Sequence, residues 1–417
     1  MTRLLKHQVQ LVCTWLVLCF ADDLVSHLPG LTNPIPFGYY SGYLDELPGR
    51  HMHYEFVESN GNNNDSLIVW LNGGPGCSSL YGFWSENGPF RVTTTGGDDD
   101  DNGQTVLLED SNSWNSLANI LYLESPVGVG FSYYSDNNTN NNNDSYVNSD
   151  NMTADSNYLA LKSFYRKFPQ YSNHSLYLTG ERLAIGNGAF NNLLFLNSRV
   201  HFAYNHGLID YEEWHDLESE CCSCSDDDSG QVCTFHHNNN NSQCNVAYDI
   251  RLMLSRDDFD NIFDTNNSSR KIPVCFEQSF QTYLNRLDVR EALHIPSHVK
   301  QWVQCQDVNY NRRLRYWDMS SAIRQLLASN KLQSFIIYNG DIDIVCDFMA
   351  NQEFVELLGL NVTLDYQRWL INNNTTVAGY EKRYDGLTYM TVRGAGHLVP
   401  KDKPLAALEI IRRLISI

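Results

Sequence analysis

The sequence is poor in basic residues, and no long apolar run follows its N-terminus. Lys and Arg number 29 against 49 Asp and Glu, so the formal net charge is −20 at pH 7. Because such a chain repels phosphate groups, nucleic acids and anionic membrane surfaces are disfavoured as partners. No later segment is long and apolar enough to span a bilayer. With 42% hydrophobic and 12% aromatic residues, the chain is expected to form a large globular core.

The N-terminus has the features of a secretory signal peptide. Arg3 and Lys6 precede a short apolar stretch at residues 9–20, and Ala21 ends a small-x-small cleavage site. The alternative interpretation is a buried N-terminal helix. We predict a leader at residues 1–21 and a mature chain at 22–417, directed to the secretory pathway and then to the lysosome or the extracellular space.

Many N-x-S/T sequons agree with a secreted glycoprotein, although an Asn-rich chain also produces such matches by chance. The candidate acceptors are Asn64, Asn137, Asn143, Asn151, Asn173, Asn240, Asn266, Asn267, Asn361, Asn373 and Asn374. Each of them is predicted to lie on the surface.

Nine of the eleven cysteines follow the leader, and five of these cluster between residues 221 and 244. In an oxidising compartment most of them should form disulfides. A zinc site is the competing interpretation, but the cluster lacks a regular pair of C-x-x-C motifs. We therefore predict disulfides and no metal, and the odd number leaves at least one thiol.

Short apolar runs alternate with helical patterns along the chain. Strands are expected at residues 67–71, 119–123, 176–179 and 335–338. A helix is expected at 155–167, and another begins near Pro404 with Asp402 as its cap. This alternation favours an α/β fold with a mostly parallel sheet covered on both faces. Residues from about 197 to 330 are polar, cysteine-rich and irregular, which indicates an insertion with short helices such as 211–219.

Three loops carry groups suited to acyl transfer, and the first two follow expected strands. Residues 72–79 (NGGPGCSS) contain successive glycines, whose N–H groups could face a developing oxyanion. Residues 340–343 (GDID) place carboxylates at a strand end. Residues 394–397 (GAGH) place a histidine in a turn before the final helix.

Four long segments then resemble the signatures of the serine carboxypeptidase family: WLNGGPGCSSLYGFWSENGPF, NILYLESPVGVGFSYY, IIYNGDIDIVCDF and GAGHLVPKDKPLAAL. They occur in the family's order and cover nearly the whole mature chain. The resemblance implies an α/β-hydrolase fold, peptide C-termini as substrates and no cofactor. It implies His397 as general base, Asp343 as the acid that orients it, and the Gly74 N–H as an oxyanion donor. Asp341 is the alternative acid, with turn hydrogen bonding as its simpler role.

The resemblance also implies a site for the terminal carboxylate of the peptide. Its members would be Asn72, Glu86 and Glu181. Two glutamates that face a carboxylate repel it unless they are protonated, so we expect such a site to work best at acid pH.

Disulfides and partners are likewise implied by the resemblance alone. The implied disulfide pairs are Cys77–Cys305, Cys221–Cys244 and Cys222–Cys233, and Cys346 is implied to be a thiol. Cys224 and Cys275 have no predicted partner. Lysosomal glycosidases and a second copy of the chain are the implied protein partners.

The resemblance breaks at the segment that should carry the nucleophile. The family continues one strand into Gly-Glu-Ser-Tyr-x-Gly, whereas here Glu181 is followed by Arg182 and by the family's next strand. No G-x-S-x-G occurs in the chain, and roughly two dozen residues are absent. Ser78 and Ser79 have a helix-start explanation and are not expected to substitute. Parallel strands need a crossover of about a dozen residues, so we expect one strand to be lost or the local sheet to be rebuilt.

Three functions are compatible with this sequence. The first is a serine carboxypeptidase whose elbow is missing through a skipped exon or an incomplete gene model. The second is a non-catalytic binding or protective protein that keeps the family shell. The third is an acyltransferase on the same fold, which also needs the serine.

Overall fold

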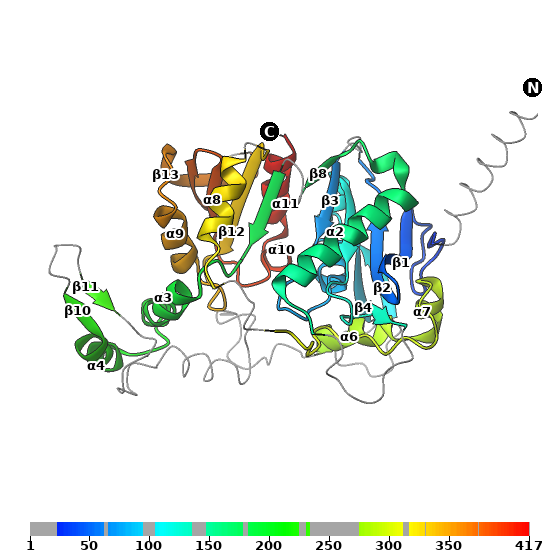
Figure 1. Cartoon of the computed structure of the whole chain (residues 1–417), viewed down its shortest axis with the longest axis horizontal. Coiled ribbons are helices and arrows are strands. Elements are labelled where there is room, and N and C mark those ends of the chain that lie inside the picture. Colours follow the sequence, from blue (N-terminus) through cyan, green and yellow to red (C-terminus); the bar gives the residue numbers. More distant parts are fainter. Residues whose placement is uncertain are drawn as a thin grey trace, which may run out of the picture. The chain divides into compact units, whose positions relative to one another are not determined.

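The computed structural model describes residues 23–61, 66–94, 105–135, 147–177, 182–224, 231–233, 275–311, 317–329, 331–373 and 375–416 (Figure 1). The chain divides into two compact units. Unit 1 comprises Met1–Leu178 and Ser269–Arg315, and unit 2 comprises Thr179–Ser268 and Tyr316–Ile417. The predicted leader lies outside the described residues. The predicted insertion contributes residues to both units, and a single mature domain stays a prediction.

Unit 1 contains a mixed sheet with parallel strands in its interior. Its order is β1-β2-β6-β3-β8, with β7 beside β2. β3 is parallel to β6 and β8, whereas β2 is antiparallel to β1 and β6. The strands are β1 (Tyr39–Leu47), β2 (Arg50–Val57), β3 (Ser66–Trp70), β6 (Asn119–Leu123), β7 (Tyr133–Tyr134) and β8 (Ser175–Tyr177), and a separate ribbon pairs β4 (Phe90–Thr94) with β5 (Thr105–Glu109). The strands expected at 67–71, 119–123 and 176–179 are confirmed within the described residues.

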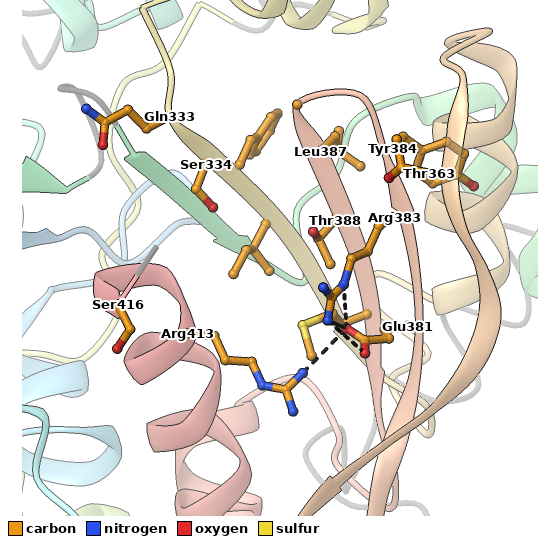
Figure 2. A pocket seen from close by; sticks show the side chains of 14 residues that line it. Gln333, Ser334, Thr363, Glu381, Arg383, Tyr384, Leu387, Thr388, Arg413 and Ser416 are labelled. Carbon is orange, nitrogen blue, oxygen red and sulfur yellow. Dashed lines mark hydrogen bonds and ion pairs between the residues drawn. The ribbon is translucent and has the colours of Figure 1, made fainter.

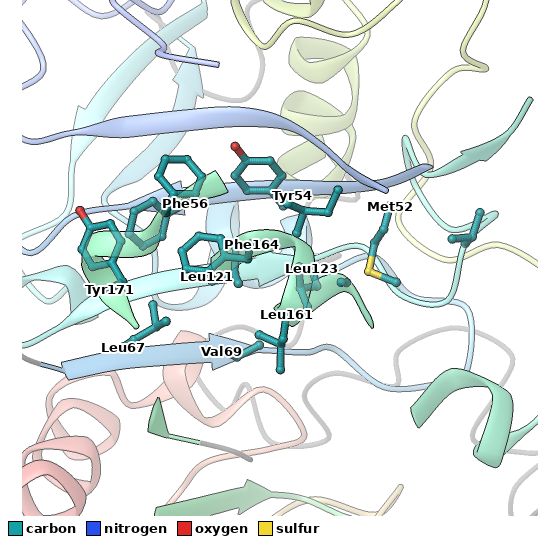
Figure 3. Packing of buried hydrophobic residues seen from close by; sticks show 14 residues of the cluster. Met52, Tyr54, Phe56, Leu67, Val69, Leu121, Leu123, Leu161, Phe164 and Tyr171 are labelled. Carbon is teal, nitrogen blue, oxygen red and sulfur yellow. The ribbon is translucent and has the colours of Figure 1, made fainter. Parts of the chain in front are cut away.

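The core of unit 1 lies between this sheet and helix α2 (Asp150–Lys167) (Figure 3). Ser149 caps the helix by accepting from the Met152 N–H, so it begins five residues earlier than expected. Ala160, Phe164 and Phe168 form its buried face, as their four-residue spacing predicts. The other helices among the described residues of unit 1 are α6 (Cys275–Leu284) and α7 (Leu287–Ala292), with short turns at Gly82–Glu86, Trp114–Ser116 and Pro169–Tyr171.

Unit 2 has a sheet of order β9-β12-β15-β14-β13. β12 is parallel to β9 and β15, and the outer pairs are antiparallel. The strands are β9 (Arg182–Gly186), β12 (Ser334–Gly340), β13 (Val362–Ile371), β14 (Thr376–Tyr384) and β15 (Leu387–Val392), and a small hairpin joins β10 (Cys222–Cys224) to β11 (Gln231–Cys233). β12 confirms the strand expected at 335–338, and all seven of its residues are buried.

Helices pack against the sheet of unit 2. α11 contacts β9, β12 and β13, while α9 contacts β12 and β15 and is itself covered by α3. The helices are α3 (Asn192–Asn205), α4 (Tyr211–Cys221), α8 (Ser320–Ala328), α9 (Phe348–Leu357), α10 (Val399–Asp402) and α11 (Pro404–Ser416). α4 confirms a helix in the polar region. Asp402 ends α10 and is therefore not the cap that was predicted for the last helix.

Both strands that flank the missing elbow are present. β8 pairs with β3 in unit 1, and β9 pairs with β12 in unit 2. The prediction that one of these strands is lost, which was one of two expected outcomes, is therefore wrong. The residues that join β8 to β9 lie outside the described part of the chain. Among the described helices, none combines the length and apolar character that crossing a bilayer requires.

Candidate functional site

A histidine–carboxylate pair lies at the carboxyl ends of β12 and β15 in unit 2. His397 Nδ1 is 2.9 Å from Asp343 Oδ2. The Asp343 side chain is fully buried, whereas the imidazole is 34% exposed. Asp343 Oδ1 accepts from the N–H groups of Val345 at 2.8 Å and Cys346 at 3.2 Å. These bonds fix the Asp343 side chain so that its other oxygen faces Nδ1 of His397, which is the geometry by which a triad acid orients its histidine.

Asn187 joins the end of β12 to the histidine loop, which we define as residues 394–397. Its side-chain oxygen accepts from the Gly340 N–H at 2.9 Å. Its amide nitrogen donates to the carbonyls of Gly396 at 3.1 Å and His397 at 2.5 Å. Asn187 is 8% exposed and has φ +47°, which is a conformation that Asn tolerates better than most residues. Sequence patterns did not identify Asn187 as a site residue, although its position after β9 in the segment Ile-Gly-Asn-Gly could have indicated it.

Two further carboxylates support the histidine loop. Asp341 Oδ1 accepts from the Gly394 N–H at 2.6 Å, and Asp402 Oδ2 accepts from the Gly396 N–H at 2.7 Å. Burial raises the pKa of Asp341, and the bond from Gly394 partly opposes this shift. Asp341 thus has the turn role that was its simpler explanation. Gly340 permits the close approach, because a Cβ there would lie 2.2 Å from the Ala395 carbonyl oxygen.

The glycine-rich loop, residues 72–79, follows β3 in unit 1. Its tip at residues 73–75 is exposed, while Ser78 and Ser79 are buried. Gly74, the candidate oxyanion donor, is in this exposed tip. The two serines have structural bonds, since Ser78 donates its hydroxyl to Glu124 and Ser79 Oγ accepts from the Asn72 N–H.

The other two candidates for the carboxylate site in unit 1 are hydrogen-bonded to each other. Asn72 Nδ2 donates to Glu86 Oε1 at 2.9 Å. Asn72 Oδ1 accepts from Trp70 Nε1 at 2.6 Å and from the Gly82 N–H at 3.2 Å. Glu86 is only 3% exposed, so it lies beneath the half-buried Asn72. Glu181, the third candidate, lies outside the described residues.

The cysteines divide into described and undescribed groups. Cys77 and Cys305 form a disulfide within unit 1. Cys221 is disulfide-bonded, but Cys244, its predicted partner, is outside the described residues. Cys222 and Cys233 are opposite each other in the register of the β10–β11 hairpin, and their disulfide stays a prediction. Cys346 is buried.

Four of the candidate glycosylation sites fall on described residues. Asn151, Asn173, Asn361 and Asn373 are all exposed. The other seven sequon asparagines lie outside the described part, and glycosylation of all eleven stays a prediction.

A cavity of about 440 Å³ in unit 2 is separate from the histidine–carboxylate pair (Figure 2). It is lined by Ser334 and Ile336 of β12 and by Leu387 and Met390 of β15. These residues begin at the amino ends of two parallel strands, whereas His397 follows the carboxyl end of β15. In open α/β sheets ligands bind outside the carboxyl ends, so this cavity is not the candidate active site. Figure 2 shows Arg383 and Arg413 converging on Glu381 inside it.

Taken with the sheet, a His–Asp pair at strand ends and a glycine-rich loop after β3 define an α/β-hydrolase of the acyl-transfer class. The family model "Serine carboxypeptidase" matches residues 29–184 and 182–417. The chain therefore belongs to the serine carboxypeptidase family.

Individual relatives agree with this assignment. The chain is 34% identical to the mouse lysosomal protective protein, with 95% of this chain and 94% of the relative covered. It is 31% identical to serine carboxypeptidase ctsa-4.1 of Caenorhabditis elegans, with 95% and 93% covered. Among solved structures, the prohormone-processing carboxypeptidase Kex1(Δp) of Saccharomyces cerevisiae matches with a TM-score of 0.71 at 20% identity, covering 95% of this chain and 96% of that one. The predicted α/β-hydrolase fold is thereby confirmed.

The family match is interrupted where the elbow should be. Its two segments meet at residues 182–184, directly after Glu181. The alignment with the mouse relative has 466 positions, which exceeds the 417 residues of this chain. The relative therefore carries segments that this chain lacks.

Proposed function

We propose that this chain is a lysosomal or secreted serine carboxypeptidase scaffold that binds peptide C-termini at acid pH but cannot cleave them. The observation that carries this proposal is a preserved base and acid, His397 and Asp343, in a chain without any G-x-S-x-G elbow. The name of the mouse relative supports the lysosomal address.

The chemistry of the complete family explains what this chain retains. A serine Oγ attacks the scissile carbonyl and gives its proton to a histidine, whose other nitrogen stays bonded to a carboxylate. His397 and Asp343 can fill the last two roles. No elbow supplies the Oγ, and losing a triad nucleophile costs about a millionfold in turnover.

Binding of a peptide does not need the nucleophile, and the described candidate groups for it lie in unit 1. The terminal carboxylate of a peptide would first meet the Asn72 amide and the exposed glycines at residues 73–74. Glu86 would act mainly by holding Asn72, because it is buried beneath that side chain. Its negative charge so near a bound carboxylate predicts tighter binding at acid pH.

Calorimetry with an N-acylated dipeptide that has a free C-terminal carboxylate tests the binding. We expect binding at pH 5, at least about 10-fold weaker binding of the C-terminal amide, and a similar loss in Asn72→Ala. Asn60→Ala, an exposed asparagine in the same unit, is the matched control and should change Kd by less than about twofold. Equal affinity for acid and amide would refute the carboxylate site.

Labelling with a fluorophosphonate tests the missing nucleophile. We expect no covalent adduct on the purified chain, because no activated serine is present. An adduct that disappears in His397→Ala would show that another serine has taken the role, and the non-catalytic proposal would be wrong.

Sequencing of the native transcript across the Glu181–Arg182 junction shows whether the elbow is absent from the natural protein or only from this sequence. An insert encoding Ser-Tyr-x-Gly after Glu181 would identify an ordinary carboxypeptidase that removes C-terminal residues at acid pH. An uninterrupted junction would support a stable non-catalytic member. For that form, association with lysosomal glycosidases or with a second copy stays a prediction, and co-purification and size-exclusion chromatography would check it.

A further inference from the structure

The glycine-rich loop rests on a buried polar network that the roles above do not use. Glu124 follows β6, and its Oε1 accepts from the Ser78 hydroxyl and from Trp302 Nε1 at 2.9 Å. Its Oε2 accepts from the Phe131 N–H at 2.8 Å and lies 2.9 Å from His53 Nδ1. Ser78, Glu124, His53 and Trp302 are each 0% exposed. Both carboxylate oxygens are thus fully hydrogen-bonded without water.

The hydrogen bonds of Ser41 determine the protons on His53. Ser41 Oγ is 3.1 Å from His53 Nε2, and its hydroxyl donates to the Leu293 carbonyl at 2.8 Å. A serine hydroxyl has one proton, so Nε2 must donate to Ser41 rather than accept from it. Nδ1 lies 2.9 Å from Glu124 Oε2, so a proton on this nitrogen as well would make the two side chains a buried ion pair.

Ser41, His53 and Glu124 have the connectivity of a Ser-His-acid triad but cannot act as one. All three are 0% exposed. The Ser41 proton also points to Leu293 instead of to the histidine, which is the reverse of what a nucleophile needs. The network must therefore serve the structure around it.

The surrounding chain makes room for this carboxylate. Gly130 has φ +53°, and a Cβ there would lie 1.6 Å from Glu124 Oε1. Ser132 Oγ donates to the Glu124 carbonyl and accepts from the His53 N–H at 2.8 Å. The segments of His53, Ser78 and Trp302, which are distant in sequence, all contact the Glu124 carboxylate.

We propose that Glu124 is a positioning residue whose ion pair with His53 anchors the glycine-rich loop through Ser78 and Trp302. A charged acceptor bonds more strongly than a neutral one, and it holds both donors in one geometry. The segment of Trp302 bonds the loop a second time, because the Gln304 carbonyl, two residues after Trp302, accepts from the Ser78 N–H at 2.8 Å. Fixing residues 76–80 in this way presents Asn72 and Gly74 to a peptide carboxylate, a last step that rests on the proposed function.

Hydrogen exchange of the full-length chain measures the anchor directly. Glu124→Gln replaces the charge by an amide that cannot accept at both atoms. We expect amides at residues 76–81 to exchange at least about 10-fold faster, with less than a twofold change in α2. Glu55→Gln is the matched control, because Glu55 is likewise 0% exposed but accepts from the Tyr39 hydroxyl instead of from the loop. It should leave the loop unchanged.

Ser78→Ala keeps Glu124 and His53 and removes the bonds of the Ser78 hydroxyl to Glu124, to Trp302 and to the Leu80 N–H, so it serves if Glu124→Gln does not fold. We expect a several-fold faster exchange confined to residues 76–81. Unchanged loop exchange in the variant that folds, or an equal rise in the loop and in α2, would overturn the proposal.

Nitrogen-15 chemical shifts of His53 give a signature that general destabilisation would not produce. The native chain should show two protonated ring nitrogens at neutral pH, and Glu124→Gln should show one. A neutral His53 ring in the native chain would refute the ion pair. In calorimetry, Glu124→Gln should raise the Kd for the dipeptide at least about fivefold. If the native chain binds no dipeptide, the proposed function fails, while exchange and chemical shifts still decide the role of Glu124.

Discussion

The two loops that carry candidate catalytic groups are held in different ways. The glycine-rich loop of unit 1 is tied by a disulfide, by one backbone bond between Gln306 and Gly76 and one between Ser78 and Gln304, and by the buried carboxylate of Glu124. The histidine loop of unit 2 is held by hydrogen bonds to several side chains, with Asn187 bonding two of its carbonyls, and by the backbone bond from the Ile342 N–H to the Ala395 carbonyl. The first loop therefore combines a covalent link with a buried carboxylate anchor, whereas the second is held by hydrogen bonds without a covalent link.

Removing the disulfide is the change expected to cost most. Cys77→Ser with Cys305→Ser opens a covalent link between positions 228 residues apart. Losing a native disulfide typically costs about 2–5 kcal/mol, and denaturant unfolding followed by tryptophan fluorescence would measure it. Because a disulfide acts mainly on the unfolded chain and Glu124 still holds the folded loop, exchange at residues 76–81 should rise no more than exchange in the rest of unit 1. A collapse of protection confined to the loop would break the comparison.

Asn187→Ala should cost less in stability but should disturb its loop more. It removes three hydrogen bonds and leaves a Cβ residue at positive φ, together about 1–3 kcal/mol. Asn187→Gly removes the same bonds without backbone strain, and the difference between the two variants isolates the strain. The resonances of His397 should broaden or shift in both. An unchanged His397 spectrum would mean that Asp343 alone orients the imidazole.

Lowering the pH should stabilise the folded form of both units through buried carboxyl groups. We expect this to be the smallest of the three effects on stability. Burial raises the pKa of Glu46 in unit 1 from 4.5 to about 7, and that of Asp347 in unit 2 from 3.8 to about 6. A raised folded-state pKa gives stability that is present below the unfolded value and is lost as pH rises through the folded value. Melting temperatures should therefore be a few degrees higher at pH 5 than at pH 7.5.

Single substitutions assign this pH effect to each unit. Glu46→Gln and Asp347→Asn should each reduce the difference in melting temperature between pH 5 and pH 7.5, because an amide does not titrate. Asn can still cap α9, as Asp347 does, so the second variant keeps its helix start. A pH difference that survives both changes would assign the effect to other groups.

Much of the fold could be read from local patterns. Apolar runs at residues 67–71, 119–123 and 335–338 gave buried strands because a strand covered on both faces needs continuous apolar side chains. The four-residue spacing of Ala160, Phe164 and Phe168 gave the buried face of α2. The predicted cap at Asp402 was wrong, because a separate turn, α10, ends there and the carboxylate bonds to Gly396 instead.

The sequence by itself determined the family, the candidate His397 and Asp343, and the absence of the elbow, because these are properties of contiguous motifs. Only the tertiary structure decided which side chains support them. Asn187 bonds a loop 210 residues away, and Glu124 joins Ser78, His53 and Trp302 from three distant segments. Such contacts leave no periodic signal in the chain, since they depend on strand order and on close approaches that exist only when the sheets are formed.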